Sequence, residues 1–380
     1  MARRWQYVAY ALAATTTTGA VGVGCSVLTS YEGYGGGDAV DPSCPARRSI
    51  PRAPSNPAAR GTRSLTGMMR SAKFLDLTKT PPASLPSFDL DGVCSTADNP
   101  RSASCANANV VADQAGTGGD NAIADNVSVL AGPDSSSFAA LLDPRQDLIG
   151  DNCKRGRHGL AITITNYDGT PNDDKVTVNV INVVGLAGAG DGGAEAKFDG
   201  TDQLLIDKAD LVGTTVTSKA SDVSAFVRDG VLYASFTDEF SIRLLAPSFD
   251  LATRKIVEFQ THIPLAYMRL VGKIDPTSTA TGLVMKGATI AGRLPIASLF
   301  KSIFEYGLCP ERGNFANIDK KVCNIADTLA NGQTKPSQKC DAVSFAFQID
   351  VAPAAKLSEA NARDAPVATP VCTSKLPTCD

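Results

Sequence analysis

Apolar and polar residues alternate along many short stretches between residues 158 and 351, and this period of two is typical of β-strands with one buried face. Residues 160–165 and 176–181 alternate in this way, and the turn-forming sequence YDGTPNDD joins them into a predicted hairpin. Asp229-Gly230 between two apolar runs predicts a tight hairpin. Further strands are expected near residues 203–206, 214–218, 223–228, 230–236, 240–245, 255–261, 266–274, 281–286, 288–293 and 343–351.

Helical spacing of apolar residues occurs late in this region, near residues 294–306 and 315–329. Many short strands with turn residues between them and few helices favour an antiparallel sheet over a parallel α/β sheet. We therefore predict a mainly β fold, an antiparallel β-sandwich or jelly-roll-like body over residues 158–351, with a few short helices and disulfide staples.

The first 24 residues resemble a secretory leader, because two arginines precede a mildly apolar stretch that ends in small residues. Cys25 follows Gly24, as in the bacterial lipobox, where the cysteine thiol receives a diacylglycerol and the chain is cut just before it. The alternative is ordinary cleavage after Ala20, which leaves Cys25 free or disulfide-bonded. No apolar run reaches the about 20 residues that a membrane-spanning helix needs.

Composition divides the rest of the chain into segments around the body. Residues 25–85 are rich in Gly, Pro and Ala and predict a flexible tether from the lipid anchor. Its arginines and Lys73 indicate either a solvated linker or a basic strap on anionic envelope polymer or lipid headgroups. Residues 86–157 form an Asp/Gly/Asn-rich, disulfide-containing module packed on the body, and residues 352–380 form a Pro/Ala-rich tail.

The ten cysteines are scattered, and none forms a C-x-x-C pair that would indicate a zinc ribbon or a thioredoxin-like site. In an exported chain they predict disulfides. We expect Cys309 to pair with Cys323, and Cys372 and Cys379 to close a small loop. Cys44 is expected to be left over, and the disulfide candidates are Cys94, Cys105, Cys153, Cys309, Cys323, Cys340, Cys372 and Cys379.

Clustered acidic residues in the 86–157 module suggest one metal site. Asp89, Asp91, Asp120 and Asp125, with Asn121, offer hard oxygen ligands beside glycines, and Ca²⁺ takes six to eight such oxygens. The spacing differs from the EF-hand loop, and the alternative is that Asp, Asn and Gly only build turns here. No other cofactor is expected.

The sequence carries no assembled catalytic signature, so we do not expect an enzyme. His158 and His262 are the only histidines, and neither a G-x-S-x-G nor an H-E-x-x-H motif is present. The G-x-G-x-x-G match at residues 188–193 lacks the helix that a dinucleotide site requires. Glycosidases usually use two carboxylates, and the candidates on or near strands are Asp238, Glu239 and Glu258.

Charge and aromatic content bear on two kinds of binding partner, nucleic acids and glycans. The net charge of −3 gives no reason to expect nucleic-acid binding. Glycan sites commonly stack sugars on aromatic rings, and outside the leader and tether the amphipathic aromatic residues are few. They are Tyr167, Tyr233, Tyr267 and Tyr306.

Several short motifs together resemble a group of uncharacterised lipoproteins from myxobacteria and related bacteria. They are the lipobox-like Cys25, DLDGVC at 89–94, GGDNA at 118–122, NYDGTPNDDKV at 166–176, FDGTD at 198–202, FVRDGVLYA at 226–234, LC at 308–309, VCNIAD at 322–327 and CDAVSF at 340–345. The resemblance covers about residues 86–350, and the chain departs from it at Phe198, where a Trp would be expected. It implies a cell-envelope lipoprotein and brings no activity or catalytic residue.

We therefore expect an exported protein, anchored by a lipid on Cys25 to the bacterial envelope, with the outer membrane favoured over the inner. Its partners would be the membrane, through the anchor, and an envelope glycan or protein. The alternatives are a glycan-binding or calcium-dependent adhesion module and, third, an extracytoplasmic hydrolase.

Overall fold

The structure is a computed structural model in which some stretches of the chain are described. These are residues 50–51, 53–54, 61–76, 83–85, 87–93, 95, 104–107, 113–114, 119–125, 148–157, 159–187, 195–213, 217–250, 255–278, 282–305, 309, 315–360, 372 and 375–379. The chain divides into two units, and all described residues belong to the unit of residues 39–380.

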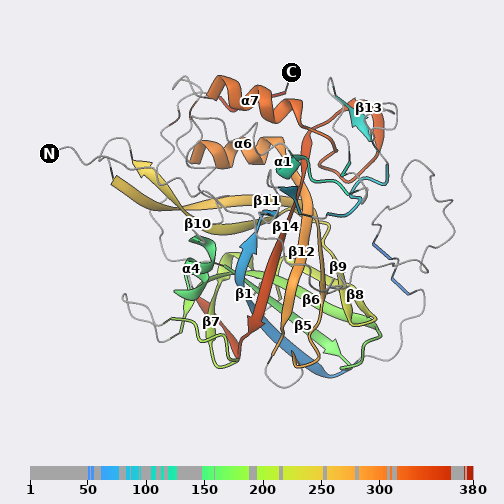
Figure 1. The fold of residues 1–380 in the computed structure, drawn as a ribbon, viewed down its shortest axis with the longest axis vertical. Coiled ribbons are helices and arrows are strands. Elements are labelled where there is room, and N and C mark those ends of the chain that lie inside the picture. The colour runs from blue at the N-terminus through green and yellow to red at the C-terminus, as the bar shows by residue number, and fades with distance from the viewer. Residues whose placement is uncertain are drawn as a thin grey trace, which may run out of the picture. The chain divides into compact units, whose positions relative to one another are not determined.

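Eight antiparallel strands form a closed barrel (Figure 1). In spatial order they are β6 (Asp173–Leu186), β5 (Gly159–Tyr167), β1 (Arg63–Lys73), β14 (Ala342–Pro353), β12 (Met285–Pro295), β11 (Lys255–Lys273), β9 (Val231–Ser235) and β8 (Ala220–Arg228). The ring closes because β8 also pairs with β6. The prediction of a mainly β, antiparallel fold with few helices is confirmed, but the sheet is a barrel rather than a clear sandwich or jelly roll.

Additional strands extend or flank the barrel. β7 (Gln203–Asp207) pairs with β6, and β15 (Lys356–Ala360) adds to β7 in parallel. β10 (Phe240–Asp250) pairs with the first part of β11, up to Leu265, before β11 enters the barrel. Two small sheets complete the set, β2 (Leu75–Asp76) with β3 (Ala83–Ser84), and β4 (Cys105–Ala106) with β13 (Lys335–Lys339).

The folded body starts earlier and ends later than the composition predicted. β1 lies within residues 25–85, which we expected to be a flexible tether, yet it pairs with β5 and β14 in the barrel wall. Its side chains Leu65, Met68 and Met69 are buried. β15 lies in the predicted loose tail. Both strands are flanked by Pro-containing sequence, and the composition of these segments outweighed the local strand pattern in the prediction.

Strand β6 forks along one edge, and polar side chains satisfy the backbone at the fork. Residues up to Val180 pair with β8, and residues from Val183 pair with β7. Between them, the Asn182 N–H donates to Asp210 Oδ2 at 2.9 Å. The side-chain amide of Asn182 donates to Ser241 O at 2.9 Å and accepts the Arg243 N–H of β10 at 2.8 Å. Arg243 forms ion pairs with Asp207 and, at 3.2 Å, with Asp210, which lies in the 3₁₀ helix η3 (Lys208–Asp210).

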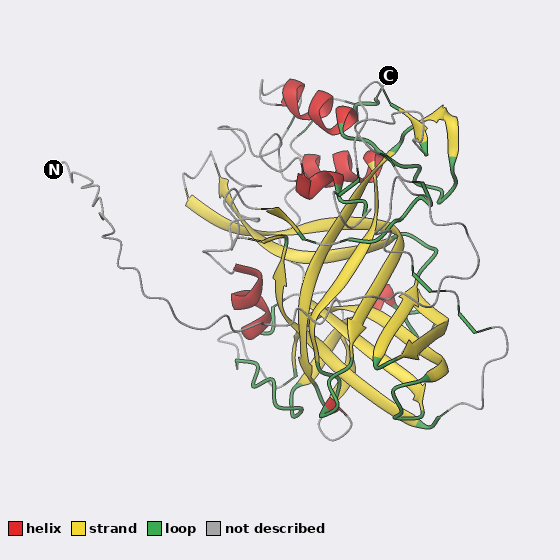
Figure 2. Cartoon of the chain, turned by 45° about the vertical axis from the view of Figure 1, so that its right-hand side comes forward, coloured by secondary structure: helices red, strands yellow, loops and turns green. Residues whose placement is uncertain are grey.

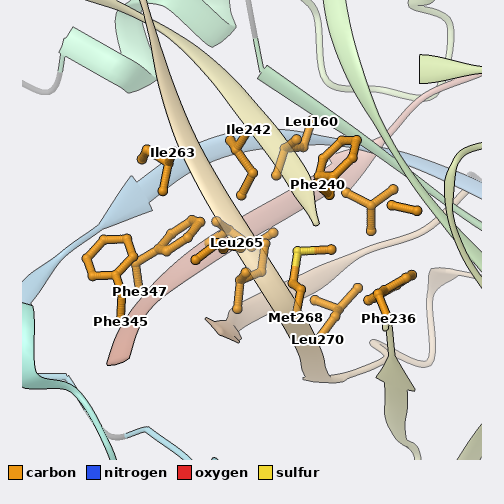
Figure 3. Close-up of a cluster of buried hydrophobic side chains, with 14 of the residues drawn as sticks. Leu160, Phe236, Phe240, Ile242, Ile263, Leu265, Met268, Leu270, Phe345 and Phe347 are labelled. Atoms are coloured by element: carbon orange, nitrogen blue, oxygen red, sulfur yellow. The ribbon is translucent and has the colours of Figure 1, made fainter. Parts of the chain in front are cut away.

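The barrel interior is filled by apolar side chains (Figure 3). Leu160, Ile162 and Ile164 of β5 point into this core, whereas Ala161 between them belongs to a second cluster on the outer face. This alternation is the period-two pattern that predicted the strand. Phe345 and Phe347 of β14 stack with each other and with Phe74 at ring distances of 5.3–5.9 Å.

Two of the described helices cover one side of the projecting β10–β11 pair (Figures 1 and 2). α6 (Ile296–Glu305) packs against β11 and α7 (Phe315–Asn324) packs against α6, within the ranges expected from helical spacing. The short helices α1 (Ala122–Asp125) and α4 (Leu148–Lys154) contact β14 and β1. Among the described helices, none is both long and apolar enough to cross a bilayer.

Three disulfides are present among the described cysteines, and two of the predicted pairings are wrong. Cys309 pairs with Cys372 and Cys323 pairs with Cys379, because the tail folds back onto the helices instead of closing on itself. Cys105 pairs with Cys340. Cys153 is buried on α4, whereas Cys25, Cys44 and Cys94 lie outside the described residues.

Truncation of Phe347 tests the barrel core. Phe347 is 1% exposed and stacks on two other rings, so Phe347→Ala should lower the free energy of unfolding by about 3–5 kcal/mol. Val223→Ala, at a 59% exposed position on β8, should change it by less than about 0.5 kcal/mol. Denaturant unfolding under oxidising conditions measures both, and equal losses would contradict this description of the core.

Candidate functional site

An acidic segment lies on the outer face of the barrel beside β12 and β14. We call its described residues between Leu85 and Asp125 the acidic cap. Phe345 and Phe347 of β14 point inward, but the outward Ala291 and Ala346 are small, so the ring of Phe88 packs directly on them. Small outward residues therefore allow the cap backbone to approach the barrel closely.

Asn121 attaches the cap to β14 at the point where the barrel wall has a free backbone edge. β1 pairs with β14 only from Gln348 onward. Just beyond, Asn121 Oδ1 accepts the Ala346 N–H at 3.0 Å and Asn121 Nδ2 donates to Ala346 O at 3.2 Å. The amide thus replaces a paired strand, and the use of Asn121 as a metal ligand stays a prediction, since an amide oxygen that accepts one N–H keeps a second lone pair.

Three of the four predicted metal-ligand aspartates lie together in the cap. Carboxylate oxygens of Asp89, Asp91 and Asp120 all fall within 4.8 Å of one another. Each of these aspartates also accepts one backbone N–H. Asp89 accepts that of Gly92 at 2.7 Å, Asp91 that of Val93 at 2.7 Å, and Asp120 that of Leu90 at 2.6 Å. A carboxylate has about four lone-pair sites, so these bonds orient the groups and leave capacity for a further ligand. The side chain of Asp125 lies outside the described set.

Two more carboxyl groups add negative charge near the cluster. Asp113 accepts the Ser95 N–H at 2.9 Å, and Asp327 accepts the Ser344 N–H at 2.7 Å. Burial raises the pKa of Asp91 to about 6 and the pKa values of Asp113 and Asp327 to about 7. Burial also raises the pKa of Asp120 well above its usual range, with repulsion from the neighbouring aspartates adding to the effect.

Arg293 brings a buried positive charge from the barrel to these carboxyls. It points outward from β12, is 2% exposed, and donates to the carbonyls of Leu90 in the cap and Leu329 after α7. Its guanidinium lies 5.6 Å from the ring centre of Tyr267. Attraction to Asp91, Asp120 and Asp327 favours the charged form of Arg293, although burial lowers its pKa overall. Arg293 therefore holds the cap and the acidic cluster on the barrel.

Hard oxygens gathered in a buried setting can bind a divalent cation or retain protons, and both reduce the same repulsion. Asp89, Asp91 and Asp120 supply the ligand type that Ca²⁺ prefers. The raised pKa values mean that, without a bound cation, part of the cluster is protonated near neutral pH.

The other residues singled out in the sequence are not brought together. His262 Nε2 lies 3.9 Å from Glu305 Oε2, and burial lowers its pKa. Asp238 and Glu239 are exposed, and Glu239 accepts a hydrogen bond from Ser298. His158, the side chain of Glu258 and the glycine-rich residues 188–193 lie outside the described set.

Two of the tyrosines considered for sugar stacking are buried. Tyr167 is 4% exposed and donates its hydroxyl to Thr170 O at 2.8 Å. Tyr233 is also 4% exposed and stacks on Phe226. Tyr267 lies under Arg293, and Tyr306 is outside the described residues. The first three positions therefore lend no support to glycan stacking.

Sequence reasoning missed Asp113, Asp327 and Arg293, which complete the electrostatics of the site. Asp113 lies in the Asp-rich module, so composition could have included it. Asp327 and Arg293 come from segments more than 160 residues further along the chain, and no local pattern links them to the cap.

Compared with known proteins, the chain matches no protein-family model, no curated protein and no solved structure at a significant level.

The acidic cluster predicts that the protein becomes less stable as pH rises towards neutrality. An unfolded aspartate loses its proton near pH 4, whereas folded Asp91, Asp113 and Asp327 keep theirs to about pH 6–7. The folded state therefore binds more protons between pH 4 and 7, and its stability falls by about 1.4 kcal/mol per pH unit for each extra proton. Denaturant unfolding at a series of pH values, with chelator present, measures this slope.

A matched pair of variants assigns the slope to the cluster. Asp113→Asn removes one titrating group and should flatten the dependence, while Asp238→Asn, at an exposed position, should leave it unchanged. Equal slopes in wild type and Asp113→Asn would rule out this origin.

Proposed function

We propose that the protein is an exported, lipid-anchored component of the bacterial cell envelope whose barrel acts as a binding or structural module. The observation that carries the proposal is the set of disulfides. They join residues 235, 63 and 56 positions apart, and they connect the cap and the tail to the body. Such long-range bonds are typical of proteins that fold in an oxidising compartment.

The proposed anchor is the thiol of Cys25, which lies outside the described residues. The lipobox-like context of this cysteine and the ordered motifs shared with myxobacterial lipoproteins support it. The membrane would be the first partner, through the lipid, and an envelope glycan or protein would be the second. The outer membrane is the proposed destination.

The mature N-terminus tests this proposal. In the native bacterium, intact-mass analysis should find a chain that starts at diacylated Cys25 and carries its cysteines in oxidised form. A Cys25→Ser variant should lose the lipid mass and leave the membrane fraction. A cytoplasmic chain that retains residues 1–24 and has reduced cysteines would contradict the proposal.

A second candidate function is supported by the acidic cluster, namely a calcium-dependent module. Three carboxylates within 4.8 Å of one another lie where the cap meets the barrel, so a bound Ca²⁺ would join loop residues 89–91 to Asp120. We propose that such an ion would fasten two parts of the cap, residues 89–91 and Asp120, to each other. In an adhesion module, this would make the cap surface dependent on external calcium.

Calcium addition separates this candidate from a cluster that only binds protons. At pH 8, which lies above the pKa values of Asp91, Asp113 and Asp327, Ca²⁺ at about 100 times its Kd should raise stability by about 2.7 kcal/mol over the chelated protein. The gain should disappear in Asp91→Asn and persist in Asp238→Asn. Identical thermal unfolding in Ca²⁺ and in chelator at this pH would remove the calcium candidate.

A further inference from the structure

The outer wall of the barrel carries two neighbouring apolar clusters besides its filled interior. One contains Phe88 of the cap with Ala291 and Ala346. The other contains Phe226, Val231 and Tyr233 of the β8–β9 hairpin. Val271 of β11 packs against both, so the clusters form one continuous apolar strip across the wall, which we call the wall strip.

Ile50 is the second residue that packs against both clusters. It is half-buried and precedes Arg63, the first residue of β1, by 13 positions. Pro51 and Pro54 follow it, and their fixed φ angles limit the conformations of the chain on either side of the contact. The contact therefore joins the part of the chain before β1 to the hairpin of β8 and β9, two strands with which β1 does not pair.

We propose that Ile50 is a clasp that holds the N-terminal part of the chain on the wall strip. The chain is then held on the barrel at this strip as well as along β1. In combination with the proposed anchor at Cys25, on which this step rests, the clasp shortens the free tether. A fully extended chain from Cys25 reaches at most about 130 Å to Arg63 but only about 85 Å to Ile50.

A single introduced tryptophan tests the clasp. The only natural tryptophan is Trp5, so subtraction of the wild-type spectrum isolates a new indole whether or not the leader has been removed. Ile50→Trp should emit at shorter wavelength than Val223→Trp, whose position is 59% exposed on β8. Acrylamide quenching of Ile50→Trp should also be weaker than that of Val223→Trp, because a partly buried indole is less accessible to the quencher.

A substitution in the wall strip provides a second test of the clasp. Phe88→Ala removes the largest ring of one cluster and should move the emission of Ile50→Trp towards that of Val223→Trp. Equal emission wavelength and equal quenching for Ile50→Trp and Val223→Trp in folded protein would overturn the clasp, whatever the effect of Phe88→Ala. The fluorescence readouts do not depend on the lipid. A Cys25 without lipid would therefore contradict the shortened tether but not the clasp.

Discussion

The closed barrel depends on strand β6, which must pair with two different strands along a single edge. It pairs with β8 to close the ring and then with β7 to extend the sheet outside it. A backbone that changes partners leaves groups unpaired, and an unpaired buried N–H or C=O is costly. Asn182 and Asp210 meet this need, and Arg243 neutralises the aspartate that accepts the Asn182 N–H. The fork is therefore stable because buried polar side chains complete it.

The acidic cap uses the same solution at another site. Where β1 ends, Asn121 takes the place of a strand against Ala346. Arg293 of the barrel donates to one carbonyl of the cap, that of Leu90, and to one of the segment after α7, that of Leu329. Both contacts form between polar groups that are almost fully buried. Since a buried polar group without a partner costs more than a lost surface contact, these bonds define one docking geometry for the cap. The cluster of aspartates is a consequence of that geometry, because their loop is held tightly against the barrel.

Local features of the fold were predictable, and features that depend on distant segments were not. The Asp229-Gly230 hairpin forms as expected, with both residues at positive φ, because two adjacent residues contain all the necessary information. Ring closure depends on β6 meeting β8, and no periodicity encodes that pairing. Asp89, Asp91 and Asp120 were found from turn composition, but Asp327 and Arg293 act on them from remote strands and loops. The predicted cysteine pairs were wrong for the same reason, since Cys372 bonds to Cys309 between α6 and α7, and Cys379 bonds to Cys323 of α7, which the tail reaches only in the folded molecule.

The position of the cysteines along the chain also constrains the order of oxidation. The later member of the three described pairs is Cys340, Cys372 or Cys379. A chain that emerges with its N-terminus first cannot form any of these bonds until nine-tenths of it has been delivered, and until then Cys105 and Cys309 are exposed to wrong partners. Correct maturation therefore requires a thiol-disulfide isomerase or an interior that collapses before oxidation begins.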